Sequence, residues 1–529
     1  MAVGPTLGTG LFIGAGQALA VGGPASLLIS YAFLSFLTYS MATTVAEVAT
    51  HMPSEHGTMV THGYLYVSSS MGFATAMLRW YSMAMLVPFE TTTAMVNLGV
   101  WQTGHNVIIR LGLITSIVVG TNFLPERFIK MSEVLFTHIK AGTMVAFLAL
   151  SLSIGLGGAS GHEQWGFKYW RDPGAMREYL AHGSLGRFLG LLQCLLHAAV
   201  AFTFAPELIV HRAENSELAE TTKRTENGHA PQSSSIPSRT AADVLQTAFP
   251  YVLSAVAVGV LAPFNEPELS NHGAGAGLSP FVIGLRTAQV NVLPTTATIA
   301  IFLSCVASGR SFLYQSSRIL CAMSELGHAP QMFQSRNRWG VPWIAVATSA
   351  SFTGVAFLSA MSSSSVVFNW LLRFVTTSGY ISWLSSCIVY RRFRQRMKSN
   401  EITSRHRFAI QPMATSFGIL ASTGLLVFGG LNAVAPSTAS ESRTVRAITT
   451  YSGIPVFLFL YVGHRFHSRR LRKQRWADIN RPDEPVEEEH PSGDVDASSW
   501  PRRVNGHPPD PFHPLGSFEM QEHPRMVGA

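Results

Sequence analysis

The sequence predicts an all-α protein that crosses a membrane many times. Only 13% of its 529 residues are charged and 47% are hydrophobic, whereas about 25% of the residues in a soluble globular domain are charged. The mean hydropathy is +0.22. Apolar runs long enough to span a bilayer core of ~30 Å recur along the chain. Together these observations favour a polytopic membrane domain and argue against a soluble enzyme.

Hydropathy predicts eleven full membrane spans and one fragment. The fragment covers residues 3–20 and contains several glycines and a proline, so we expect an interrupted helix there. Because about 20 apolar residues cross the bilayer as a helix, we expect full spans at 26–50, 73–100, 106–124, 133–156, 187–210, 243–263, 290–309, 341–361, 366–390, 413–435 and 445–463.

The distribution of basic residues predicts the orientation. Lysine and arginine are concentrated in 391–412 and just after the last span, and they are absent from 101–105. Because basic loops stay in the cytoplasm during insertion, we expect a transmembrane domain at 1–463 and a largely disordered cytoplasmic tail at 464–529. The net charge is +8, but the basic residues lie between apolar runs rather than on one folded face, so no nucleic-acid partner is expected.

Several chemistries find no support in the sequence. The four cysteines lie in or beside apolar segments without metal-ligand spacing, so we expect no disulfide framework, metal or cofactor. Neither a P-loop nor a nucleophile elbow is present, which argues against an ATP-driven pump and a membrane hydrolase. Transport would then be driven by a gradient or be passive.

The strongest local motif is Gly8-Thr9-Gly10, followed by an apolar turn. Glycines allow a membrane helix to unwind, and the exposed backbone N–H groups can then hold a carboxylate without a fixed charge in lipid. The alternative is a glycine-rich face on which two helices pack closely. Spacing alone does not separate these two interpretations.

A second interruption is predicted inside the span 187–210, at Phe204-Ala205-Pro206-Glu207. Pro206 lacks a backbone donor and therefore leaves a carbonyl free to accept from a substrate ammonium. Glu207 could bind a proton or a cation, because an ionisable residue inside a membrane helix usually has a function. Alternatively, Pro206 only kinks the helix, and a solvated Glu207 pairs with Arg212.

Further charged residues fall inside predicted spans. Lys140 either extends its side chain to the interface or points inward and carries a proton. For Glu47 and Glu90, a solvated position at a helix end and a polar packing role fit equally well. Arg373 must find water, a carboxylate or carbonyl oxygens.

With these residues in view, the sequence resembles the fungal amino acid permeases of the amino acid, polyamine and organocation superfamily. The resemblance covers most of the chain, and it rests on the order and spacing of short motifs: Leu7-Gly8-Thr9-Gly10-Leu11-Phe12-Ile13-Gly14, Gly22-Gly23-Pro24-Ala25, Ala46-Glu47-Val48-Ala49-Thr50, Pro88-Phe89-Glu90, Ile139-Lys140, Gly166-Phe167-Lys168-Tyr169-Trp170, Ser279-Pro280-Phe281, Leu293-Pro294, Ser316-Ser317-Arg318 and Val367-Phe368-Asn369-Trp370.

This resemblance implies a LeuT-like fold with two inverted five-helix repeats and two further C-terminal helices. It also implies that the first and sixth helices unwind at the substrate site. Gly8, Thr9 and Gly10 would hold the substrate carboxylate through backbone amides. Residues 204–207 would meet the α-amino group and side chain, and Lys140 inherits a candidate role in proton coupling beside Glu207.

The sequence departs from the family pattern in four places. Relatives have a longer N-terminus and a first half of helix one that precedes the glycines, so we expect helix one to be truncated. Ala205 stands where the family usually has glycine. Arg310 stands where relatives have asparagine, and Arg373 replaces a residue that is usually uncharged.

The function implied is uptake of L-amino acids by proton symport, through alternating access, in a membrane that we expect to be the plasma membrane. The partners would be an amino acid, protons and membrane lipid. One alternative is a transport-inactive amino acid sensor on the same fold. Another is a truncated permease without function.

Overall fold

The computed structural model describes residues 10–51, 58–98, 107–157, 166–226, 235–269, 279–288, 293–360, 365–400, 407–434 and 442–479. In this part of the chain the regular structure is helical throughout, and no strand occurs. The predicted all-α class is therefore confirmed. The chain divides into two units, Met1–Arg465 and Phe466–Ala529. The described part of the second unit continues the last helix as far as Ile479.

The first half of the chain begins with a π-helical turn, η1, and continues through α-helices of very different length. The elements are η1 Gly10–Gly14, α2 Ala15–Gly22, α3 Pro24–His51, α4 Thr58–Tyr66, α5 Ser69–Leu98, α6 Val107–Thr121, α7 Glu126–Gly155, η2 Trp170–Gly174, α8 Gly183–Phe202, α9 Ala205–Glu226 and α10 Ile236–Leu261.

The second half is also helical, and two of its helices exceed thirty residues. Its elements are η3 Pro267–Leu269, α11 Pro280–Thr287, α12 Leu293–Glu325, η4 Gln331–Gln334, α13 Trp343–Ala350, η5 Ser351–Ala360, α14 Ser365–Ser399, α15 Met413–Phe428, α16 Leu431–Val434, α17 Arg443–Tyr451 and α18 Gly453–Ile479.

Six of the described helical stretches are long and apolar enough to cross a membrane: Pro24–His51, Arg127–Gly155, Gly183–Leu218, Ile236–Leu261, Pro294–Glu325 and Arg443–Arg469. Within the described residues, every predicted span coincides with helical structure, and two of the helices are longer than the spans. Helix α12 continues past residue 309 and α14 past residue 390. The reason is that hydropathy marks the part of a helix in lipid, whereas hydrogen bonding lets the helix continue into polar sequence.

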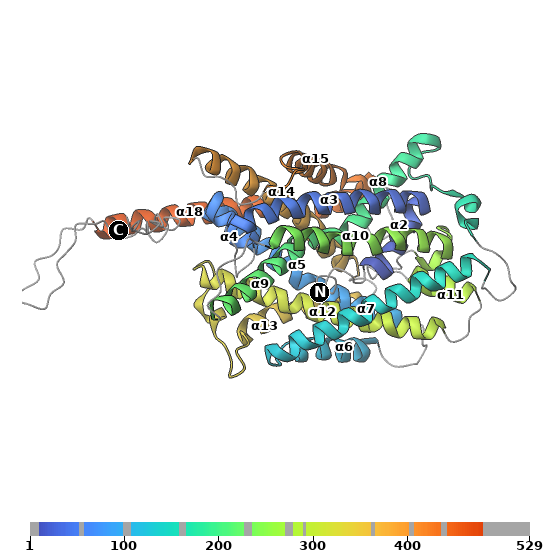
Figure 1. The fold of residues 1–529 in the computed structure, drawn as a ribbon, viewed down its shortest axis with the longest axis horizontal. Helices are drawn as coiled ribbons and strands as arrows, with labels where there is room; N and C mark the ends of the chain where they lie inside the picture. Colours follow the sequence, from blue (N-terminus) through green and yellow to red (C-terminus); the bar gives the residue numbers. More distant parts are fainter. Residues whose placement is uncertain are drawn as a thin grey trace, which may run out of the picture. The chain divides into compact units, whose positions relative to one another are not determined.

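Helices α3 and α5 form the centre of the bundle. Helix α3 packs against α8 and α10, and α5 packs against α12 and α14; Figure 1 shows α3, α10 and α7 running side by side. Small and hydroxyl side chains are buried along α3, among them Ser30, Thr38 and Ser40. Such residues let helix backbones approach closely in a membrane. Close packing matters there because lipid is as apolar as leucine, so burying apolar side chains between helices gives no hydrophobic gain.

A sharp turn joins α2 to α3 and requires a glycine. Gly23 has φ +83°, a left-handed conformation that residues with a Cβ atom rarely adopt. Its N–H donates to the Leu19 carbonyl and ends α2, while Pro24 occupies the first position of α3. Proline suits that position because its missing donor would have no intrahelical acceptor there. The turn therefore sets the direction in which α3 leaves η1 and α2.

Candidate functional site

The glycine motif meets the described structure at Gly10, the first residue of η1. Gly8 and Thr9 lie outside the described residues. From Gly10 to Gly22 the chain is helical, with a π-helical turn followed by α2, so the expected interruption within 10–20 takes the form of a wider turn and not of a break. Single π-helical turns are rare and are frequent at functional sites.

Contacts with three helices hold η1 inside the bundle. Leu11, Phe12 and Ile13 are buried. The Phe12 ring lies edge-on to Phe147 of α7, with 5.7 Å between ring centroids. The Ser279 hydroxyl, directly before α11, donates to the Phe12 carbonyl at 2.7 Å. One of the backbone acceptors of η1 is therefore satisfied by a side chain.

The second predicted interruption separates α8 from α9. Helix α8 ends at Phe202 and α9 begins at Ala205, with a turn at Thr203 and Phe204. Thr203 keeps helical angles, φ −51° and ψ −40°, so the interruption is a short kinked turn rather than a long unwound segment. Pro206 explains the kink, because proline cannot donate to the preceding turn.

The two interruptions lie against each other. A Cβ atom added to Gly10 would lie 2.6 Å from the Ala201 Cβ atom, one residue before α8 ends. A Cβ atom on Gly379 of α14 would lie 1.5 Å from the Thr203 Cγ2 atom on the opposite side of the turn. Only glycine fits at either position, so small residues bring η1, the α8–α9 turn and α14 together.

An aromatic cluster borders this meeting point. Tyr31, Phe202 and Tyr251 are at most 1% exposed, and their ring centroids lie 4.4–5.7 Å apart. The Tyr251 hydroxyl lies 3.9 Å from the position of a Cβ atom on Gly10. Sequence reasoning missed this cluster, because single aromatic residues in apolar spans are indistinguishable from packing residues.

Glu207 lies in the interior of the bundle in an ion pair. Its side chain is 0% exposed and pairs with Arg79 of α5, and the Ser382 hydroxyl donates to its other oxygen at 2.7 Å. The alternative of a solvated Glu207 paired with Arg212 is therefore wrong. Arg212 points instead to Glu133 of α7, at 3.0 Å. The charge of Arg79 inside an apolar span was the sequence signal that could have indicated its role.

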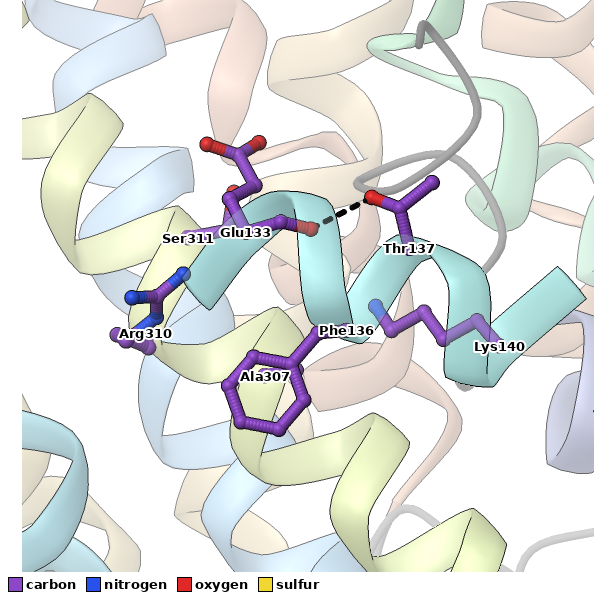
Figure 2. Close-up of a pocket in the computed structure, with 7 residues that line it drawn as sticks. All are labelled: Glu133, Phe136, Thr137, Lys140, Ala307, Arg310 and Ser311. Atoms are coloured by element: carbon purple, nitrogen blue, oxygen red, sulfur yellow. Dashed lines mark hydrogen bonds between the residues drawn. The ribbon is translucent and has the colours of Figure 1, made fainter. Parts of the chain in front are cut away.

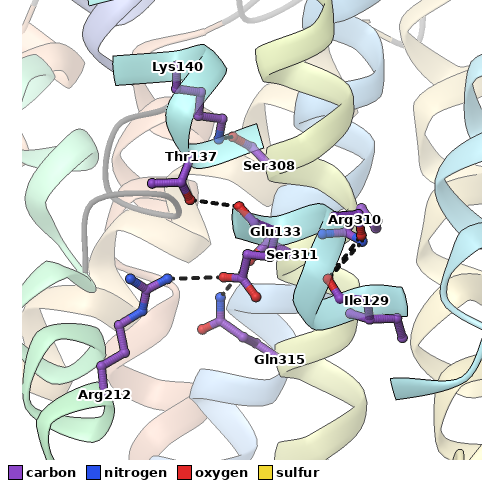
Figure 3. A network of polar contacts seen from close by, with 10 residues as sticks. Ile129, Glu133, Thr137, Lys140, Arg212, Ser308, Arg310, Ser311 and Gln315 are labelled. Atoms are coloured by element: carbon purple, nitrogen blue, oxygen red, sulfur yellow. Dashed lines mark hydrogen bonds and ion pairs between the residues drawn. The ribbon is translucent and has the colours of Figure 1, made fainter. Parts of the chain in front are cut away.

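Lys140 is buried and does not reach the surface. It is 3% exposed, and its ammonium donates to the Ser308 hydroxyl of α12 at 2.7 Å. The alternative in which Lys140 extends to the interface is therefore wrong. Glu90 of α5 also interacts electrostatically with the Lys140 ammonium. Figure 3 shows the ammonium directed from α7 towards α12.

The remaining intramembrane charges also have partners. Glu47 has a fully buried side chain and lies 3.3 Å from Arg394 of α14, so a packing role is supported over a solvated helix end. Arg373 donates to the Thr449 hydroxyl at 3.0 Å. In the described ranges, no three histidine, cysteine or acidic side chains gather where they could hold a metal ion.

The close approach at Gly10 leads to a first prediction. We expect Gly10→Ala to lower stability by about 1–3 kcal/mol, because the new methyl group overpacks against Ala201. Adding Ala201→Gly should restore part of the loss, since it removes the atom that clashes. Thermal unfolding of the purified protein in detergent measures both effects. Equal stability of Gly10→Ala and the wild type would contradict this packing.

The buried ion pair leads to a second prediction. Glu207→Gln leaves the Arg79 charge buried without its carboxylate, and breaking such a pair costs about 3–5 kcal/mol. The double variant Arg79→Gln with Glu207→Gln removes both charges and should recover most of this loss. Thermal unfolding of the two single variants and the double variant tests the coupling. Additive losses would show that the two residues do not stabilise each other.

Comparison with known proteins places the chain in a family. The amino acid permease family model matches residues 1–477. A probable proline-specific permease of Schizosaccharomyces pombe is 32% identical, over 88% of this chain and 82% of the relative. A proline-specific permease of Saccharomyces cerevisiae is 32% identical, over 91% and 76%. A general amino acid permease of the same yeast is 28% identical, over 88% and 71%.

A solved structure supports the fold. A mutant of the manganese transporter of Eremococcus coleocola aligns with 88% of this chain and 94% of its own, with a TM-score of 0.55 and 12% identity. This similarity confirms the predicted fold of a polytopic LeuT-like transporter. The relatives are permeases and not enzymes. The chain is therefore an integral membrane protein that belongs to the amino acid permease family and acts in amino acid transport.

Proposed function

We propose that this protein transports L-amino acids by proton symport and alternating access, in the plasma membrane, with the segment after residue 463 in the cytoplasm. The observation on which the proton coupling depends is the buried ammonium of Lys140, which is bonded to Ser308 and interacts with Glu90. An amine held away from water between a hydroxyl and a carboxylate can gain and lose a proton without leaving the bundle.

The substrate site in this proposal lies where η1 meets the α8–α9 turn. The backbone amides of Gly8, Thr9 and Gly10 hold the carboxylate, as donors at the positive end of a half-helix do. The backbone at Phe204, Ala205 and Pro206 accepts from the substrate ammonium. The contact between Gly10 and Ala201 supports this arrangement. The groups that bind the carboxylate and the ammonium of one small amino acid must lie close together.

Glu207 has a narrower role in this proposal than a free carboxylate would have. Its two oxygens are engaged by Arg79 and Ser382, so it fixes α9 against α5 and α14 beside the substrate. We therefore assign the transported proton first to Lys140, with Glu207 as the second candidate. The membrane lipid contacts the exposed apolar side chains of the outer helices, such as Leu113 and Phe459.

Proline is the first substrate to test. Two relatives that are 32% identical are named proline-specific permeases. The buried aromatic side chains of Phe202 and Tyr251 could pack against a pyrrolidine ring, which is apolar and rigid. The other L-amino acids follow in the same assay, since a relative that is 28% identical is named a general amino acid permease.

Uptake into proteoliposomes tests the proposal. The wild type should accumulate a radiolabelled L-amino acid when the outside is acidic, and should release protons inside, as reported by an enclosed pH dye. In Lys140→Met, the stimulation of uptake by the proton gradient should fall at least tenfold, while exchange of labelled for unlabelled amino acid continues. Lys168→Met, which changes an exposed lysine, is the matched control.

Two results would contradict the proposal. Binding of amino acid without uptake, by correctly inserted wild type, would indicate a sensor. Unchanged pH dependence in Lys140→Met would remove this residue from the coupling.

A further inference from the structure

A stripe of polar side chains leads from Lys140 towards the start of α7. Glu133, Thr137 and Lys140 are four and then three residues apart, and this spacing places them on one face of the helix. The facing side of α12 presents Ala307, Arg310 and Ser311, and these residues and Phe136 line a narrow pocket between the two helices, with a cavity volume of about 10 Å³. Figure 2 shows Glu133 and Lys140 at opposite ends of this stretch.

Exposure changes along the stripe. Lys140 is 3% exposed, whereas the Glu133 side chain is 30% exposed and lies seven residues after the start of α7, closer to that end of the helix. Thr137, between them, is buried; its hydroxyl donates to the Glu133 carbonyl oxygen at 2.8 Å and keeps its lone pairs available as acceptors. Glu133 is therefore the carboxylate on this face through which a proton could pass between the buried amine and solvent.

Cations surround the Glu133 carboxylate. Arg212 of α9 lies 3.0 Å from it, and Arg310 of α12 also interacts with it. Arg310 is held in place by the Ser132 hydroxyl and by the Ile129 carbonyl, as Figure 3 shows for the second of these contacts. On the other elements packed here, Asp243 of α10 interacts with Arg212, and Cys305 of α12 and Glu90 of α5 interact with Lys140.

We propose that Glu133 relays protons between Lys140 and the solution at the end of the bundle where α7 begins. This inference rests on the proposed proton coupling. The Lys140 ammonium gives one proton to the Glu133 carboxylate, which leaves a neutral amine and a carboxylic acid. The acid then releases that proton to water and becomes a carboxylate again. Seven residues of helix rise about 10 Å. The pocket has room for about one water molecule, which together with the Thr137 hydroxyl would bridge the two groups.

The two arginines position the Glu133 carboxylate. Arg212 of α9 makes an ion pair with it at 3.0 Å, and Arg310 of α12 interacts with it from the helix that also carries Ser308, the partner of Lys140.

The test uses the full-length protein in proteoliposomes and the L-amino acid that gives the largest wild-type uptake. Glu133→Gln should reduce both the proton influx that accompanies this amino acid and its net uptake at least tenfold. Counterflow exchange, which needs no net proton movement, should fall less than threefold. Glu133→Asp should restore most of the proton influx, because it retains a carboxylate on the same face.

Arg212→Gln is the matched control for the ion pair. It breaks the same contact but retains the carboxylate, so proton influx should fall by less than the tenfold expected for Glu133→Gln. Glu220→Gln, which removes an exposed carboxylate paired with Arg239, controls for the loss of a negative charge on α9 and should change nothing.

Several outcomes would overturn the relay. Normal proton influx in Glu133→Gln, while Lys140→Met is uncoupled, would refute the relay and leave the proposed symport intact. Equal losses of influx and counterflow in both Glu133→Gln and Arg212→Gln would show that the ion pair only supports the fold. Uptake by the wild type without any proton influx would contradict the symport and the relay together.

Discussion

The structure depends on how backbone polar groups are satisfied at membrane depth. An unpaired N–H or C=O group in lipid costs several kcal/mol, so a helix can be interrupted only where protein surrounds it. Here the η1 turn and the α8–α9 turn lie against each other, with Gly10 beside Ala201 and Thr203 beside Gly379. The α8–α9 turn is also shielded by α14. In the proposed site, the same contact brings the backbone of both turns close enough to bind one zwitterion.

Paired charges are the second constraint on the interior. Three ion pairs each join two helices that are distant in the sequence: Glu47 with Arg394, Glu207 with Arg79, and Glu133 with Arg212. A buried charge is tolerated only with a partner, so each pair restricts which helices can be neighbours. Lys140 is buried and its ammonium donates to a neutral hydroxyl, that of Ser308. For this reason we propose it as the group whose charge changes during a transport cycle.

Much of the fold could be predicted from hydropathy, because lipid imposes length and composition on each helix independently of the others. Helices α12 and α14 are longer than the spans that hydropathy predicts, because hydrogen bonding lets a helix continue into polar sequence. Partner choice was the harder problem. Arg212 is close to Glu207 in sequence and on the same helix, yet it faces Glu133, while Arg79 reaches Glu207 from α5. Which face of a helix meets which neighbour depends on packing across the bundle, and a single sequence does not contain that information.

The most direct test of the account is a cryo-EM structure of the protein in a lipid nanodisc with a bound L-amino acid. The account predicts density for the ligand beside the contact between Gly10 and the end of α8, with its carboxylate within hydrogen-bond distance of the backbone amides that begin η1 and its ammonium facing the carbonyl groups before Pro206. Ligand density elsewhere in the bundle, or a carboxylate bound to the Arg79 side chain, would contradict it.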